Sequence, residues 1–143
     1  MTAAAIPLWI HLSLMEGCCN RVEWALAAVA AGDARREMQL YVALAQSLTF
    51  TRGAAITEVG AASAKALEIA ESLGNPEYQL RALRDLWVFR FNSGQHCLAL
   101  TLAQRFYTVA ATRLDPFERM IGERLIGMSQ YYLGELPGAR HLI

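Results

Sequence analysis

The sequence predicts an all-α fold, in which about eight antiparallel helices stack as hairpins to form an α-solenoid. Apolar residues recur at helical spacing along the chain, and no segment has the alternation of a β-strand. The helix boundaries also repeat, because Pro76 and Pro116 are 40 residues apart, as are Gly94 and Gly134. Self-similarity at a fixed period of this size is typical of helical solenoids. We therefore expect residues 1–143 to form one repeat domain.

The composition indicates a single domain and argues against nucleic-acid binding. The chain has 143 residues, 55% of them hydrophobic and 18% charged, which is enough for one domain with a substantial core. Lys and Arg number 13, as do Asp and Glu, so the formal net charge is zero. A surface dedicated to nucleic acid normally needs a basic excess, and we therefore expect no direct nucleic-acid binding.

The opening segment and the cysteines indicate a cytoplasmic protein. Residues 1–15 carry no Lys, Arg, Asp or Glu, but the segment is too short for a transmembrane helix and lacks the basic start of a signal peptide. We expect no association with a membrane. Three cysteines, two of them adjacent, do not form a disulfide framework.

Four helices are expected before the fifth begins near residue 75. They cover residues 6–15, 22–31, 34–51 and 55–73. The first is apolar and ends near Gly17, and the second is rich in alanine. Between the second and third, Gly32 suits the end of a helix, and Asp33 can cap the next.

The fifth and sixth helices form the best-defined hairpin. Asn75 can cap the fifth helix, with Pro76 at its first position. Glu77 favours the helix dipole and can pair with Arg81 one turn later. The chain turns at residues 92–94. The sixth helix then carries an apolar stripe at Ala99, Leu102, Ala103, Phe106 and Ala110.

A similar start signal opens the seventh helix. Asp115 is its expected N-cap, Pro116 its first residue, and Glu118 completes a capping box. The eighth helix begins near Pro137 and has only about two turns before residue 143. A terminal helix this short caps a solenoid poorly, so we expect the chain to be a fragment of a longer array.

Several segments resemble tetratricopeptide-like (TPR-like) repeats. These are ALEIAESLGN at 66–75, YQLRAL at 78–83, GELPGAR at 134–140 and the opening PLWIHLSL at 7–14. More narrowly, they resemble the C-terminal array of bacterial transcriptional regulators that join a winged-helix DNA-binding domain to a STAND-type P-loop ATPase. The resemblance implies a right-handed TPR-like solenoid. It also implies that the chain senses a signal or contacts a protein partner, which could be another domain of the same regulator.

The chain departs from that family in three respects. Its period is nearer 40 residues than the roughly 34 of the standard repeat. The standard repeat has a small residue at the packing position of its first helix. This chain has Trp87 there, whereas the next hairpin has Gly127. No GxxxxGK[ST] motif and no winged-helix segment is present, so the resemblance transfers neither ATPase nor DNA-binding activity.

The resemblance implies that a concave groove, lined by the first helix of each hairpin, binds the partner. With the two glycine turns aligned, three pairs of residues take equivalent places along this groove. They are Arg84 with Arg124, Val88 with Met128, and Phe91 with Tyr131. Two arginines beside apolar residues suit an acidic or carboxylate-ended peptide. In the alternative interpretation Arg84 pairs with Asp85 or Glu77, and Arg124 with Glu123, on a solvated face.

A second hypothesis is a small-molecule sensor. Its pocket would lie between hairpins and be lined by Trp87, Phe91, Met128 and Tyr132. An enzyme is not expected, because the sequence offers no nucleophile–base or carboxylate set.

No cofactor or metal site is expected. The three histidines, His11, His96 and His141, are far apart in sequence and show no ligand spacing. Cys18 and Cys19 could bind a soft metal or sense oxidation, but no third ligand is near, which favours ordinary buried thiols. Cys97 beside His96 is poorly placed for a Cys–His pair, because neighbours on a helix point in different directions.

Overall fold

The computed structural model describes residues 15–28, 33–113, 115–135 and 138, and these form six α-helices without a strand. The helices are α2 (Met15–Ala28), α3 (Ala34–Arg52), α4 (Thr57–Ser72), α5 (Pro76–Asn92), α6 (His96–Ala111) and α7 (Pro116–Tyr132). The prediction of an all-α fold is confirmed for this part of the chain. Residues 6–14 of the expected first helix, and all but Gly138 of the expected eighth helix from Pro137, lie outside the described residues.

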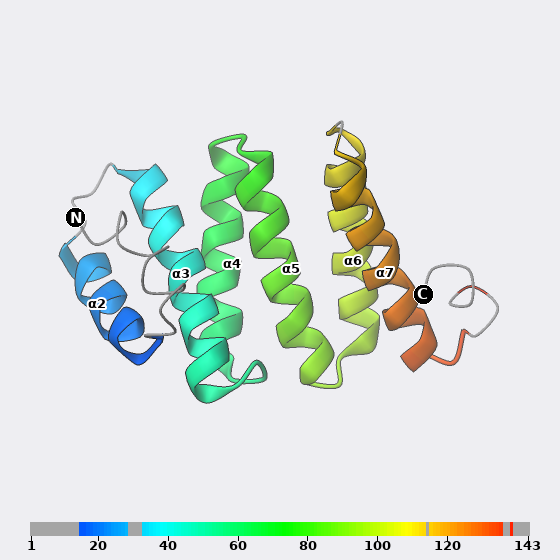
Figure 1. Cartoon of the computed structure of the whole chain (residues 1–143), viewed down its shortest axis with the longest axis horizontal. Helices are drawn as coiled ribbons and strands as arrows, with labels where there is room; N and C mark the ends of the chain where they lie inside the picture. Colours follow the sequence, from blue (N-terminus) through cyan, green and yellow to red (C-terminus); the bar gives the residue numbers. More distant parts are fainter. Residues whose placement is uncertain (1–14, 29–32, 114, 136–137, 139–143) are drawn as a thin grey trace.

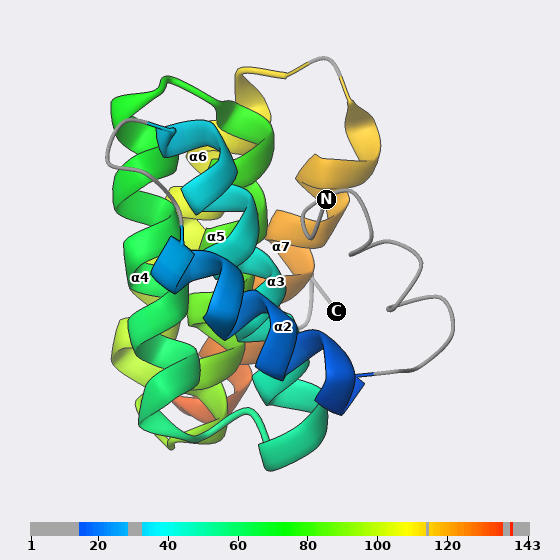
Figure 2. The same ribbon diagram turned by 90° about the vertical axis from the view of Figure 1, so that its left-hand side faces the viewer.

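Each helix packs against the next one in the chain, and α3 also contacts α5. Figure 1 shows the helices in a row from α2 to α7, with successive helices running in opposite directions. In the perpendicular view of Figure 2, α4 and α6 lie on one side of the molecule and α3 and α7 on the other.

Three predicted N-caps are confirmed. In each, a side-chain oxygen accepts a hydrogen bond from a backbone N–H two or three residues later: 3.2 Å at Asp33, 3.2 Å at Asn75 and 2.9 Å at Asp115. The helix ends follow the predicted pattern as well. Gly94 and Gly134 have φ angles of 73° and 81°, a left-handed conformation that favours glycine after the last turn of a helix.

The expected boundary near Gly17 is wrong. A single helix, α2, runs from Met15 through Gly17 to Ala28, where two helices had been expected to end and begin. An internal glycine costs only about 1 kcal/mol relative to alanine, so packing can outweigh it. Val22 supplies that packing, because it is fully buried against Leu40 and Ala43 of α3.

The largest hydrophobic cluster connects α3 to α7 through α4, α5 and α6. Its buried members are Val42, Ala66, Leu67, Leu80, Ala82, Leu83, Leu86, Trp87, Ala99, Ala103, Phe106, Ala110 and Leu125. Burial of this apolar surface is the main stabilising contribution to the row of helices. Within the described residues, no helix is long and apolar enough to cross a membrane.

A candidate partner-binding face on α5 and α7

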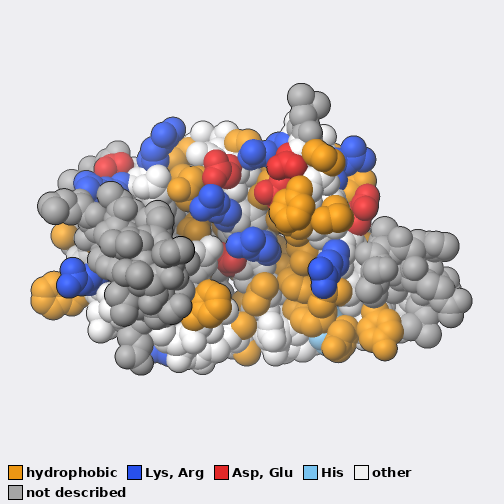
Figure 3. All heavy atoms as spheres, viewed as in Figure 1, with side chains coloured by type: hydrophobic (Ala, Val, Ile, Leu, Met, Phe, Trp, Pro, Cys, Tyr) orange, Lys and Arg blue, Asp and Glu red, His pale blue; other side chains and the backbone are white. Residues whose placement is uncertain are grey.

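The six residues predicted to line the groove separate into an exposed set and a partly buried set. Arg84, Arg124 and Tyr131 are exposed. Val88, Phe91 and Met128 are partly buried and pack against the main hydrophobic cluster. Figure 3 shows a band of hydrophobic side chains on the face where α5 and α7 lie, with Lys or Arg side chains among them.

The two arginines differ in their partners. The Nε of Arg84 lies 3.8 Å from Oδ1 of Asp85, as in the alternative interpretation of this face. Glu77 pairs instead with Arg81, as the sequence predicted, at 2.7 Å. Arg124 forms no ion pair with any residue that the structure describes, Glu123 included. An exposed cation is therefore available on α7.

Asp85 is a buried carboxyl group at the edge of this face. Its side chain is 13% exposed, and Oδ2 has no hydrogen-bond partner in the described part of the chain. Burial raises the pKa of Asp85 from 3.8 to about 6, and the nearby charges of Arg84 and Arg81 oppose that rise only in part. From the sequence, Asp85 was expected only as a possible partner of Arg84, and its burial was not predicted.

Five rings meet at the ends of α5 and α7 and the start of α6, and we call them the aromatic cluster. Its members are Trp87, Phe91, His96, Tyr131 and Tyr132. Ring centroids lie 4.7 Å apart for Trp87 and Phe91, and 4.8 Å apart for Phe91 and Tyr132. His96 lies 5.2 Å from Phe91 and 5.0 Å from Tyr132. These separations are typical of favourable aromatic pairs.

His96 was not predicted to belong to this cluster. The tight turn at residues 93–95 brings the first residue of α6 back against the last turn of α5, which places the His96 ring beside that of Phe91. That five-residue separation across a glycine turn is the signal that could have identified it. Nδ1 of His96 is buried and has no hydrogen-bond partner among the described residues.

In the hypothetical small-molecule pocket, the three aromatic residues contact one another in series, from Trp87 through Phe91 to Tyr132. Trp87 is 6% exposed, and its indole N–H donates a hydrogen bond of 2.9 Å to Oγ of Ser129. Phe91 lies between Trp87 and Tyr132, and Met128 packs against the same core. Ser129, a buried residue that sequence reasoning overlooked, therefore connects α7 to α5.

Exposed apolar side chains lie near both ends of α7. Phe117 is 59% exposed, Met120 is 56%, Tyr131 is 56% and Tyr132 is 58%. Large apolar side chains that gather at the surface often mark a site of protein interaction. Together with the exposed Arg124, these residues offer both apolar contact and a positive charge.

The cysteines and the other two histidines were further candidates from the sequence. Cys97 is exposed, whereas the side chains of Cys18 and Cys19 are outside the described part of the chain, as are His11 and His141. Among the described residues, no three His, Cys, Asp or Glu side chains are arranged to hold a metal ion.

Comparisons of the chain with protein-family models, with curated proteins and with solved structures find no match. The class of the protein therefore rests on its own helices: over the residues that the structure describes it is all-α, and its helices pack in sequence order.

Proposed function

We propose that the chain is a non-enzymatic interaction or sensor module that binds an acidic peptide segment of a protein partner on the α5–α7 face. The proposed fold is a right-handed TPR-like solenoid of about eight helices. Following the family resemblance, the module would belong to a bacterial signalling or transcriptional regulator. Its partner would be a separate protein or another domain of that regulator.

The pattern of burial supports the solenoid. Residues 40 positions apart on α3, α5 and α7 are buried together, as in the sets Val42, Ala82, Gly122 and Ser47, Trp87, Gly127. The second helices of the hairpins follow the same offset: Val59, Ser63, Ala66 and Ala70 of α4 are buried, and so are Ala99, Ala103, Phe106 and Ala110 of α6. Equivalent packing at a fixed period is what a stack of structural repeats requires.

The observation that carries the functional proposal is the exposed Arg124, which has no ion-pair partner among the described residues and lies two helical turns before the exposed Tyr131 and Tyr132 on α7. A carboxylate can form two charge-assisted hydrogen bonds with one guanidinium group, and an adjacent aromatic ring can cover the apolar part of the same peptide. Arg84 occupies the equivalent position on α5, so a peptide lying across both helices would meet two cations.

The proposal can be tested in two steps. Residues 1–143 serve as bait in a bacterial lysate, and the captured proteins are identified by mass spectrometry. Acidic segments of those proteins are then synthesised with a free C-terminal carboxylate, with an amidated C-terminus, and with Lys replacing the acidic residues. Their affinities for the chain are measured by calorimetry. We expect the acidic peptides to bind and the Lys-substituted peptides to lose binding.

A charge-matched pair of variants locates the site. Arg84→Glu/Arg124→Glu should weaken binding of the acidic peptide at least about tenfold, because loss of one charged hydrogen bond costs about 1.5–3 kcal/mol. Arg35→Glu/Arg36→Glu makes the same charge change at exposed positions on α3 and should leave binding unchanged. Equal loss in both variants, with helicity unchanged, would show a general charge effect and would reject the α5–α7 face as the site.

A further inference from the structure

A groove lies between α4 and α6. These two helices are on the other side of the molecule from α3 and α7 (Figure 2). The volume of the groove is about 390 Å³, and α5 forms its floor. Leu67 and Leu86, both nearly buried, lie at the bottom, and Leu98 and Leu102 line the α6 wall. The α4 wall runs from Ala64 to Glu71, which is about 10 Å at the rise of an α-helix. This shape accommodates an elongated apolar group.

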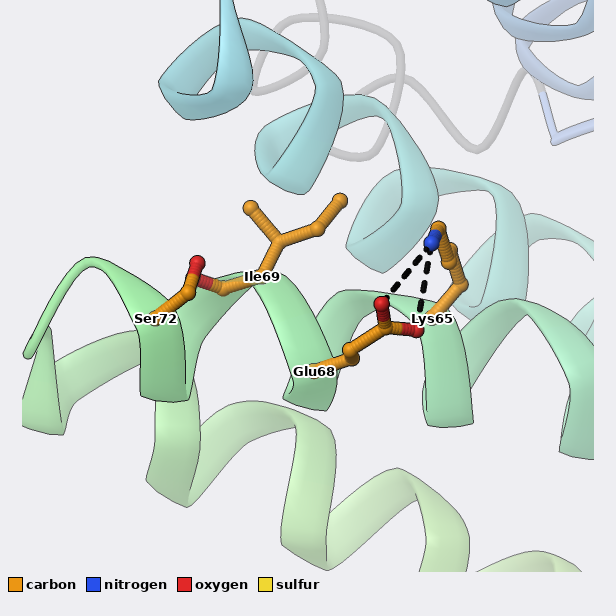
Figure 4. A network of polar contacts seen from close by, with 4 residues as sticks. All are labelled: Lys65, Glu68, Ile69 and Ser72. Atoms are coloured by element: carbon orange, nitrogen blue, oxygen red, sulfur yellow. Dashed lines mark hydrogen bonds and ion pairs between the residues drawn. The ribbon is translucent and has the colours of Figure 1, made fainter.

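The carboxylates that line the groove already have cationic partners. Oε1 of Glu71 accepts a hydrogen bond of 2.6 Å from Arg105, across the gap between α4 and α6. Both carboxylate oxygens of Glu68 lie 3.1 Å from Nζ of Lys65, one turn away on α4 (Figure 4). These pairs leave the acidic side of the groove close to neutral.

Arg90 is the exception among the charged residues of this groove. Its guanidinium donates a hydrogen bond of 2.5 Å to Oε1 of the neutral Gln95 and lies 5.1 Å from the ring of Phe89. No carboxylate of the described chain pairs with it. The partial negative charge at the end of α5 offsets this positive charge only in part. The equivalent positions on α3 and α7 carry Phe50 and Gln130, so the repeated packing does not require a cation here.

We propose that the α4–α6 groove binds a small carboxylic acid with an aliphatic body. The carboxylate would pair with the guanidinium of Arg90, and the aliphatic chain would cover Leu67, Leu86 and Leu102 as far as the Glu71–Arg105 pair. An amine fits less well, because its positive charge would face the guanidinium of Arg90. A doubly charged acid also fits less well, because the groove beyond Arg90 is apolar and ends at the Glu71–Arg105 pair, which is already neutralised. This site is separate from the α5–α7 face and does not depend on the peptide-binding proposal.

The test is an NMR titration of the chain with octanoate, and with octylamine as the probe of opposite charge. We expect octanoate to cause saturable shifts of backbone amides in α4 and α6, around Leu67 and Leu102. Octylamine should cause none there. Shifts of equal size with octylamine, or octanoate shifts that lie outside α4, α5 and α6, would overturn the proposal.

Two variants change the groove in different ways. Arg90→Gln removes the charge, and Ala64→Phe fills the groove from an exposed position on α4. Each should raise the dissociation constant for octanoate at least about tenfold, as expected for loss of a charge-assisted hydrogen bond or of the bound volume. Retention of wild-type affinity by either variant would overturn the proposal. Arg84→Glu/Arg124→Glu should bind octanoate normally, which distinguishes this site from the peptide-binding face.

Discussion

The contact between Trp87 and Ser129 connects two helices that are not neighbours in sequence. The indole N–H donates to Oγ of Ser129, and that hydroxyl in turn donates a 2.8 Å hydrogen bond to the carbonyl oxygen of Leu125. Both side chains are buried, so neither polar group can turn to water if its partner is removed. A single hydroxyl therefore has more influence on stability here than it would at the surface.

Ser129→Ala should lower the free energy of unfolding by about 1–3 kcal/mol, because it leaves the buried indole N–H without an acceptor. Chemical denaturation measures this change. In a Trp87→Phe background, which has no indole N–H, the same substitution should cost distinctly less. An equal cost in both backgrounds would show that the Trp87–Ser129 bond contributes nothing of its own.

The pKa of Asp85 gives the stability of the chain a specific pH dependence. The folded-state pKa is about 6 and the ordinary value is 3.8, so the folded chain holds the proton more tightly than the unfolded chain. Stability is therefore greatest below pH 4 as far as this group is concerned, and it falls as the pH rises through 6. Well above pH 6 the buried charge is fully present, which costs at most about 3 kcal/mol at 1.36 kcal/mol per pKa unit.

Asp85→Asn should stabilise the chain at pH 7.5 and lose most of that advantage at pH 4. Thermal unfolding at the two pH values measures the effect. Asp115→Asn is the matched control, since Asp115 is exposed and asparagine caps a helix equally well. A gain for Asp85→Asn that is the same at both pH values would contradict the assignment of the pH dependence to this carboxyl group.

At the scale of the element, two glycines within helices differ in how closely they are packed: Gly60 is in close contact with a neighbouring helix, and Gly17 is not. A Cβ atom added to Gly60 on α4 would lie 2.5 Å from Cε1 of Phe89 on α5, whereas one added to Gly17 on α2 would meet nothing within 4 Å. The glycine in α4 thus allows a close approach to α5, and the glycine in α2 does not serve any described contact.

Gly60→Ala should destabilise the chain by about 1–3 kcal/mol, because the Phe89 ring must move within a packed cluster. Gly17→Ala should instead stabilise it by up to about 1 kcal/mol through helix propensity. Denaturation midpoints of the two variants compare these effects directly. A Gly60→Ala/Phe89→Leu double variant should recover part of the loss, and failure to do so would mean that the ring is not the obstacle.

The ends of the helices were predictable wherever a side chain determines them locally. Asn75–Pro76 and Asp115–Pro116 combine a cap with a fixed φ angle, and the helices α5 and α7 begin where these pairs place them. The start of α2 was mispredicted because Gly17 resembles a helix end, while the burial of Val22 against α3 is a tertiary contact that no local signal reports.

At the scale of the whole molecule, the hydrophobic contacts among the described residues are unevenly distributed. The main cluster joins α3 through α7, whereas α2 packs mainly on α3 through a small separate cluster of Val22, Leu40 and Ala43. Regions with few buried apolar contacts open at lower free energy than the rest of a domain.

Amide hydrogen exchange should therefore be faster in α2 than in α5. In native conditions we expect α2 amides to exchange by local opening, and α5 amides only by opening of the main cluster. Val22→Ala should increase exchange in α2 and leave α5 largely unchanged. Equal protection of the two helices would show that the row unfolds as one cooperative unit.

Some features of the candidate sites could be predicted from the sequence, but the partners of individual side chains could not. The period of 40 residues placed Arg84 and Arg124 at equivalent positions, and both are exposed. It did not reveal that Asp85 is buried beside one of them, that Ser129 accepts the Trp87 hydrogen bond, or that Arg90 has no acidic partner in the part of the chain that the structure describes. Those facts depend on contacts between helices, which helical spacing alone does not determine.

Because Trp87 is buried, it can serve as an intrinsic fluorescence probe of the α5–α7 face. An indole that is shielded from water and hydrogen-bonded across two helices changes its fluorescence when either condition is lost. In a Trp9→Phe/Trp24→Phe background it is the one remaining tryptophan. Its emission would then follow the spacing of α5 and α7 without any attached dye. The rate at which a peptide binds to the α5–α7 face could then be measured by stopped-flow fluorescence.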